Sequence, residues 1–168
     1  MEIDVIENSI KDSKINFIIN PTFWDDIDPT VKKLVNAEWK EIKFYNANKK
    51  PNDQLNHLPS NKGGIYIFII KPNIIPDTHM YIMYIGRALI TENENLKKRC
   101  KHYYNDERPK VKRMIDHWWK YVYIRYLPLD DNDIIKKTEE ELINKIIPPC
   151  NDRIPNKEVM SAVKAFSM

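Results

Sequence analysis

One glutamate in the C-terminal third of the chain occupies a position where its side chain could do chemistry. A helix is expected over residues 132–147, and its apolar stripe holds Ile135, Leu142 and Ile146 at helical spacing. Glu139 lies four residues after Ile135 and therefore faces the same way. A carboxylate that faces inward is costly unless it is paired or bound to a metal. Two explanations follow: an ion pair with a buried Arg or Lys, or a hard oxygen ligand for Mg²⁺.

Tyrosines and glycines gather on two short apolar runs in the middle of the chain. β-Branched and aromatic residues fill about 64–71 and 80–86, and a polar linker with two prolines separates them, so the pattern predicts two strands joined by a loop. Each run carries a tyrosine that is explained either as a core residue or as part of a site: Tyr66 and Tyr84. The three glycines of the chain all lie at the edges of these strands: Gly63, Gly64 and Gly86.

The same central segment carries the basic charge. Residues 61–128 hold 13 Lys and Arg against 6 Asp and Glu, whereas the segments on either side are slightly acidic and the whole chain has a net charge of +3. Local positive charge indicates a polyanionic partner such as nucleic acid, and a solvated basic face is the alternative. Four of these cations are close neighbours in a predicted helix: Lys97, Lys98, Arg99 and Lys101.

These residues, taken in order, carry a resemblance. Gly64-Ile65-Tyr66 followed by Tyr84-Ile85-Gly86 resembles the pair of motifs that names the GIY-YIG nuclease superfamily. Leu96-Lys97-Lys98-Arg99 is similar to the first helix of that family. Glu139-x-x-Leu142-Ile143 followed by Pro148-x-x-Asn151 is similar to its C-terminal Glu and Asn. The match covers roughly residues 60 to 153. It departs from compact members in the long linker between the two motifs, which we interpret as an insertion.

The resemblance implies a role for each of six side chains. Arg99 would clamp the scissile phosphate, because a guanidinium holds phosphate with two parallel hydrogen bonds and keeps its charge. Glu139 would bind Mg²⁺, for which Mn²⁺ can substitute. The hydroxyls of Tyr66 and Tyr84 would lie in the active site, where one of them orients or deprotonates the attacking water. The two remaining catalytic residues that the family pattern implies are Arg87 and Tyr103.

Arg87 stands where many members have Lys, and it would bind phosphate or lower the pKa of a tyrosine. Tyr103 follows Arg99 by four residues, where other members have His or Tyr. Asn151 is expected to hold the loop after the last helix by side-chain hydrogen bonds. Gly64 and Gly86 are expected to be structural. Three lysines are expected to contact nucleic acid: Lys97, Lys98 and Lys101.

The remaining pattern completes an α+β fold. We expect one helix to start at the capping box Thr91-x-x-Glu94 and another at about Pro109, and we expect a third strand at 119–126 that Pro128 ends. The order β-β-α-α-β-α predicts a small three-stranded antiparallel sheet flanked by helices. Residues 61–153 would form the nuclease domain, 1–60 an N-terminal extension packed on the core, and 154–168 a C-terminal tail.

Within the extension, two elements are expected. A short strand is expected at Ile15 to Ile19. A helix is expected from the cap at Asp28 and Pro29 through Ile42.

The composition of the chain bears on its cellular location and on the class of nuclease. No apolar run approaches the ~20 residues that span a bilayer, so no membrane association is expected. No signal peptide is visible, and Cys100 and Cys150 have no metal-binding spacing, so we expect a cytoplasmic protein with reduced thiols. Few residues follow Asn151, which favours a restriction or defence nuclease over a homing enzyme with a separate DNA-reading domain.

The sequence thus predicts a Mg²⁺-dependent DNA endonuclease, with RNA left open as a substrate. Cleavage of both strands of a duplex by one site per chain would imply a homodimer. The alternatives are a structure-specific or repair nuclease and a nucleic-acid-binding module without catalysis.

Overall fold

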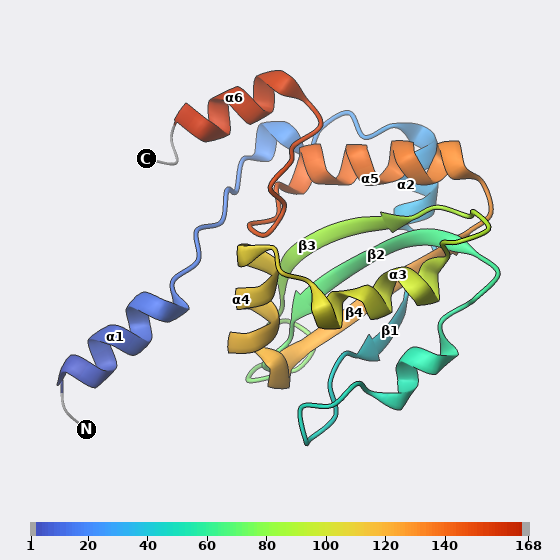
Figure 1. Cartoon of the computed structure of the whole chain (residues 1–168). Helices are drawn as coiled ribbons and strands as arrows, with labels where there is room; N and C mark the ends of the chain where they lie inside the picture. The colour runs from blue at the N-terminus through green and yellow to red at the C-terminus, as the bar shows by residue number, and fades with distance from the viewer. Residues whose placement is uncertain (1–2, 166–168) are drawn as a thin grey trace.

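The computed structural model describes residues 3–165 and has the predicted α+β class (Figure 1). Its centre is an antiparallel sheet of four strands in the order β1-β4-β2-β3. The strands are β1 (Lys40–Lys43), β2 (Gly63–Ile70), β3 (Tyr81–Ala88) and β4 (Val122–Leu129). The helices in the described residues are α1 (Ile3–Ser13), α2 (Pro29–Val35), α3 (Leu96–His102), α4 (Pro109–His117), α5 (Asn132–Ile146) and α6 (Lys157–Ala165).

The prediction of three strands is wrong, because residues of the expected N-terminal extension add a fourth. The helix expected from Asp28 through Ile42 ends at Val35, and β1 follows and pairs with β4. Ile42 is buried in the core, whereas its neighbours Glu41 and Lys43 are on the other face of the sheet. Four residues of alternation are too few to distinguish from a helical stripe by pattern alone.

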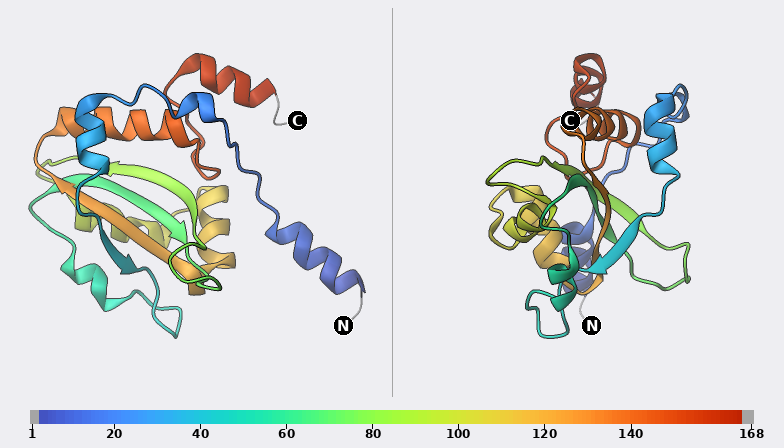
Figure 2. Two further views of the ribbon diagram at one scale, coloured as in Figure 1. Left: turned by 180° about the vertical axis from the view of Figure 1, so that it is seen from behind. Right: turned by 90° about the vertical axis from the view of Figure 1, so that its right-hand side faces the viewer.

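The central strand β2 is buried along its whole length, since it has neighbours on both sides and both faces are covered. One face packs Tyr66, Phe68 and Tyr84 against α3 and α4, in a core that also contains Met114 and Leu96. The other face packs isoleucines of β2 and β3 against α5, in a second core: Ile65, Ile67, Ile69, Ile85, Ile135, Leu142 and Ile143. Figure 2 shows the sheet between these two layers of helices.

Several boundaries differ from the sequence prediction. Helix α3 begins at Leu96 with Asn95 as its N-cap, while Thr91 accepts a hydrogen bond from the Glu94 amide in a turn before the helix. Strand β4 begins at Val122, because a single 3₁₀ turn occupies 119–121. It does not end at Pro128, which pairs with Gly64 inside the strand. Proline is tolerated there because β1 reaches only as far as Tyr126, so this end of β4 is open on one side.

A helix lies near each end of the described residues. Residues 14–20, where a strand was expected, are irregular, and α6 lies within the expected C-terminal tail. Helix α1 projects from the body and is attached to α4 by a 2.9 Å hydrogen bond between Ser13 and His117 (Figure 1). Cys100 and Cys150 are both free and buried. Within residues 3–165, no helix is long and apolar enough to cross a membrane.

Candidate active site

The two motif glycines make room for the backbone and ring of Tyr66. Tyr66 on β2 is opposite Gly86 on β3, and a Cβ at Gly86 would lie 2.5 Å from the Tyr66 ring and hydroxyl. Gly64 has φ of +148°, and a Cβ there would lie 2.2 Å from the carbonyl oxygen of Leu127. A side chain at Gly86 would displace the Tyr66 ring, whereas one at Gly64 would clash with the backbone of β4 and strain its own backbone, so both positions favour glycine.

Three tyrosines form one cluster on this face of the sheet. The ring centroids of Tyr66, Tyr84 and Tyr103 lie 5.6 to 6.5 Å apart in their three pairs. The hydroxyls of Tyr66 and Tyr103 share a 2.8 Å hydrogen bond. Burial raises the pKa of Tyr66 well above its ordinary value and also raises the pKa of Tyr103. Both hydroxyls are therefore protonated at neutral pH in the free protein.

Arg99 reaches this cluster from helix α3. Its Nε donates to the Tyr66 hydroxyl at 3.2 Å, and its guanidinium lies 5.8 Å from the centroid of the Tyr103 ring. Leu96 and Cys100, on the same helix, are buried against the sheet and fix the rotation of α3. The terminal Nη1 and Nη2 of Arg99 have no hydrogen-bond acceptor within residues 3–165, so the four N–H donors of these two nitrogens remain for a ligand.

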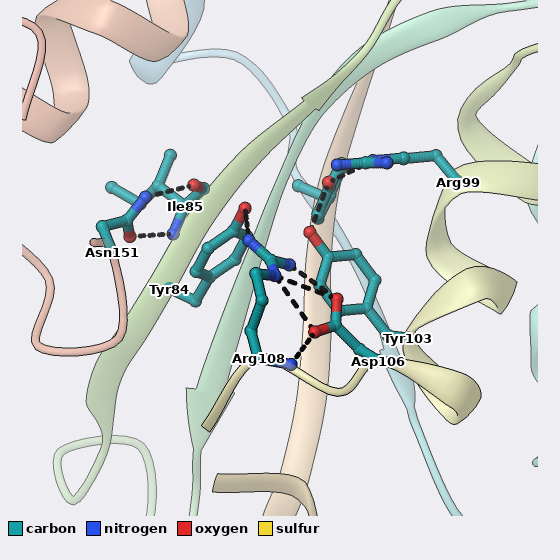
Figure 3. Close-up of polar contacts among 8 residues, drawn as sticks. Tyr84, Ile85, Arg99, Tyr103, Asp106, Arg108 and Asn151 are labelled. Carbon is teal, nitrogen blue, oxygen red and sulfur yellow. Dashed lines mark hydrogen bonds and ion pairs between the residues drawn. The ribbon is translucent and has the colours of Figure 1, made fainter. Parts of the chain in front are cut away.

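A second arginine, which sequence reasoning missed, binds the opposite end of the cluster. Arg108 donates from Nη1 to the Tyr84 hydroxyl at 3.2 Å, and its guanidinium lies over the rings of Tyr84 and Tyr103 (Figure 3). Asp106 holds it in place with a 3.0 Å contact to Nε and a 2.7 Å contact to Nη2. Arg108 belongs to no motif and to no periodic pattern of residues in the sequence. It lies in the turn after α3, outside the regular elements, and this turn places it beside the tyrosines.

Glu139 and Arg87 meet between α5 and β3. Glu139 Oε2 lies 2.8 Å from Arg87 Nη1, and the Glu139 side chain is 16% exposed, against 52% for Glu140. Arg87 therefore faces Glu139, and its only other acidic neighbour in the described residues is Glu140, at 3.5 Å. Of the two explanations for an inward Glu139, the ion pair is present in the structure.

The charges around Glu139 connect it to the tyrosine cluster. Burial raises the pKa of Glu139, and the nearby guanidinium groups of Arg87, Arg99 and Arg153 oppose that rise. Arg99 is thus one of the cations near Glu139, although the residue that pairs with Glu139 is Arg87. Arg153, an exposed residue after α5, was not predicted.

A single carboxylate is available for a metal. No group of three or more His, Cys, Asp and Glu side chains is arranged to bind a metal ion anywhere in residues 3–165. Glu139 keeps Oε1 free of any hydrogen-bond donor among these residues, while Oε2 is paired with Arg87. The residues fit a Mg²⁺ held by one protein oxygen, with phosphate and water as its other ligands, which is how Mg²⁺ is commonly bound at phosphate sites.

Asn151 fastens the loop after α5 to the edge of the sheet. Its Oδ1 accepts from the Ile85 amide at 2.9 Å, and its Nδ2 donates to the Ile85 carbonyl at 2.8 Å (Figure 3). The side-chain amide thus imitates a neighbouring strand at the open edge of β3, and the Cys150 amide adds a bond to the Met83 carbonyl. This arrangement is the loop-holding role that the sequence predicted.

The three lysines of α3 differ in their surroundings. Lys97 and Lys101 both donate to Asn56, to its backbone oxygen and its side chain respectively, and so tie α3 to the 3₁₀ turn at 53–57, before β2. Lys98 is exposed and lies 3.5 Å from the Asn93 carbonyl. All three contact neutral acceptors, so none of these contacts cancels a positive charge.

Comparison of the chain with family models, with curated proteins and with solved structures gave no significant match.

Proposed function

We propose that this chain is a Mg²⁺-dependent endonuclease that hydrolyses phosphodiester bonds in DNA, and that it uses the site implied by its GIY-YIG-like motifs. The observation that carries the proposal is the position of Arg99. This residue contacts Tyr66 of the first motif, while Glu139 of the C-terminal motif pairs with Arg87, which follows Gly86 of the second motif. A protein that only binds nucleic acid has no need for a largely buried carboxylate beside these cations.

Arg99 is the phosphate clamp in this proposal. Its Nε is occupied by the Tyr66 hydroxyl, which fixes the plane of the guanidinium. Nη1 and Nη2 then face outward as a fork that matches two oxygens of a phosphate. The same fork neutralises the charge that develops on those oxygens during the reaction.

Glu139 is the residue that would hold the metal. When bound, Mg²⁺ would polarise a phosphate oxygen and stabilise the leaving oxygen. Arg87 keeps Glu139 oriented through the 2.8 Å ion pair. In the reaction, the oxygen of water forms a bond to phosphorus and the bond from phosphorus to one sugar oxygen breaks. The proton that water loses is balanced by one that the leaving oxygen gains from solvent.

A cleavage assay tests this proposal against a binding module without catalysis. Supercoiled plasmid is incubated with the protein in Mg²⁺, in Mn²⁺ and in EDTA, and affinity is measured by gel shift under the same conditions. We expect nicked or linear product with either metal and none in EDTA. Salt-sensitive binding without cleavage in either metal would instead support the binding module.

We also propose a restriction or defence role, with a structure-specific repair nuclease as the alternative. Sequencing the ends of digested genomic DNA separates the two. A restriction enzyme gives ends that share a short sequence, whereas a repair nuclease gives ends at branched or damaged positions. Incubation with RNA in place of DNA tests which nucleic acid is the substrate. The mass of the active species in solution tests the proposed homodimer.

A further inference from the structure

The three hydroxyls of the tyrosine cluster differ in what surrounds them. Tyr66 is fully buried, and its hydroxyl accepts from Arg99 and shares a hydrogen bond with Tyr103. A phenol has one donor and two acceptor sites, so Tyr66 uses most of its capacity inside the protein. It has little left with which to bind an attacking water.

Tyr84 lies at the other end of the cluster and is oriented by Arg108. Arg108 can only donate, so the Tyr84 oxygen accepts this hydrogen bond and the hydroxyl proton points elsewhere. The guanidinium also lies 5.1 Å from the centroid of the Tyr84 ring, so it fixes both the ring and the oxygen. The Arg108 side chain is 40% exposed, which places this end of the cluster nearer to solvent than Tyr66.

Asp106 makes the position of Arg108 rigid. Its two carboxylate oxygens bind Nε and Nη2, and Oδ1 also accepts from the Arg108 backbone amide at 3.0 Å. A bidentate pair of this kind fixes the plane of the guanidinium as well as its distance. The Asp106 side chain is only 16% exposed, so the pair is partly shielded from solvent.

We propose that Arg108 is a positioning residue that makes Tyr84, rather than Tyr66, the tyrosine that contacts the attacking water. The inference rests on the proposed nuclease function. It divides the cluster between two arginines: Arg99 with Tyr66 serves the phosphate, and Arg108 with Tyr84 serves the water. Because Arg108 acts through the Tyr84 hydroxyl, its contribution to turnover disappears when that hydroxyl is absent.

A double-mutant cycle in plasmid cleavage tests this dependence. Arg108→Ala in the otherwise wild-type protein is expected to lower kcat about 100-fold, the scale that a misplaced reacting group costs, with KM changed less than about threefold. In a Tyr84→Phe background the same change is expected to lower kcat less than about threefold. In a Tyr66→Phe background it keeps its full effect. Lys110→Ala is the control, because Lys110 is a cation only two residues away, in the first turn of α4, and it pairs with Asp152 at 3.1 Å.

The outcomes separate this inference from the function on which it rests. A wild-type protein that cuts, with Arg108→Ala equally harmful with and without the Tyr84 hydroxyl, overturns the inference alone. A rise in KM with kcat unchanged also overturns it, because Arg108 would then bind substrate directly. A wild-type protein that cuts no DNA in Mg²⁺ or Mn²⁺ overturns both. Arg108→Lys keeps the positive charge and replaces Arg108→Ala in the cycle if the alanine variant does not fold.

Discussion

Arg99 on α3 donates a 3.2 Å hydrogen bond to the hydroxyl of Tyr66 on β2, and this bond joins the helix to the central strand. The donor is Nε, the guanidinium nitrogen that is bonded to the side-chain carbon Cδ. The two terminal nitrogens remain for phosphate, so the contact with Tyr66 orients the arginine without blocking it.

Arg99→Lys is expected to be nearly as damaging to cleavage as Arg99→Ala. Lysine keeps the charge but cannot donate to Tyr66 and to two phosphate oxygens in one plane. The measurement is kcat/KM for plasmid cleavage, with a loss of about 100-fold or more expected for both variants. Lys98→Ala is the matched control from the same helix, and it should weaken binding modestly, most visibly at low salt, and make binding less dependent on salt. Near-normal turnover of the lysine variant would make Arg99 part of a general basic surface.

Tyr66→Phe and Tyr84→Phe are expected to differ in stability. The Tyr66 hydroxyl is fully buried with two hydrogen bonds, so its loss should cost about 1 kcal/mol and leave Tyr103 short of a partner. The Tyr84 hydroxyl has one bond, to an arginine that Asp106 holds independently. Thermal melts and cleavage rates of both variants check this. Equal melting temperatures for the two would contradict this difference in hydrogen bonding.

Gly86→Ala is expected to lower both stability and cleavage. The added methyl group would lie 2.5 Å from the Tyr66 hydroxyl, so the ring must move and its bond to Arg99 must lengthen. Overpacking of this kind costs about 1–3 kcal/mol. Tyr66→Ala is itself destabilising, because Tyr66 is fully buried, but it removes the clash, so Gly86→Ala should lower the melting temperature less in a Tyr66→Ala background than in the wild type. An equal loss in both backgrounds would show that the strand itself, and not the ring, requires glycine.

How far the sequence predicts this molecule depends on how local each signal is. The strands β2 and β3 and helix α5 follow from runs of residues with one clear period. Glu139 is 16% exposed and Glu140 52% exposed, which is the difference that the helical register predicts. Strand β1 is too short to show its period, and it exists because the open edge of β4 supplies its partner.

The missed site residues and pairings are those that tertiary contacts select. Arg87 was predicted as a site residue, but nothing in the sequence identifies it as the partner of Glu139. Arg108 and Asp106 are two residues apart in a turn. A turn has no periodic pattern of apolar residues, so the sequence does not predict that Arg108 contacts Tyr84 on β3. Only the packing of α3 and α4 on the sheet brings these groups together.

Glu139→Gln is expected to abolish cleavage while it preserves or tightens DNA binding. Gln keeps the size of the side chain and removes a negative charge from beside a polyanion. It also removes the charged oxygen that Mg²⁺ prefers. Gel shift and plasmid cleavage are measured side by side for Gln at positions 139, 140 and 141. Glu140 and Glu141 are the controls, and a Glu139→Gln protein that still cuts would remove this residue from the metal site.

The same variant should also be more stable than wild type at neutral pH. Burial raises the pKa of Glu139 above its ordinary value near 4.5, so the folded protein binds this proton more tightly than the unfolded chain does. The free energy of unfolding of the wild type therefore falls as the pH rises through the folded-state pKa of Glu139. The Gln variant has no group that titrates at this position, so its stability does not fall for this reason. Arg87 keeps Glu140 as a neighbour at 3.5 Å and remains partly exposed, which limits the cost of breaking its pair. Melting temperatures of both proteins between pH 4 and 8 check this. The advantage of Gln should shrink toward the acid end, and a Gln variant less stable than wild type at pH 7 would show that the ion pair with Arg87 outweighs the cost of burial.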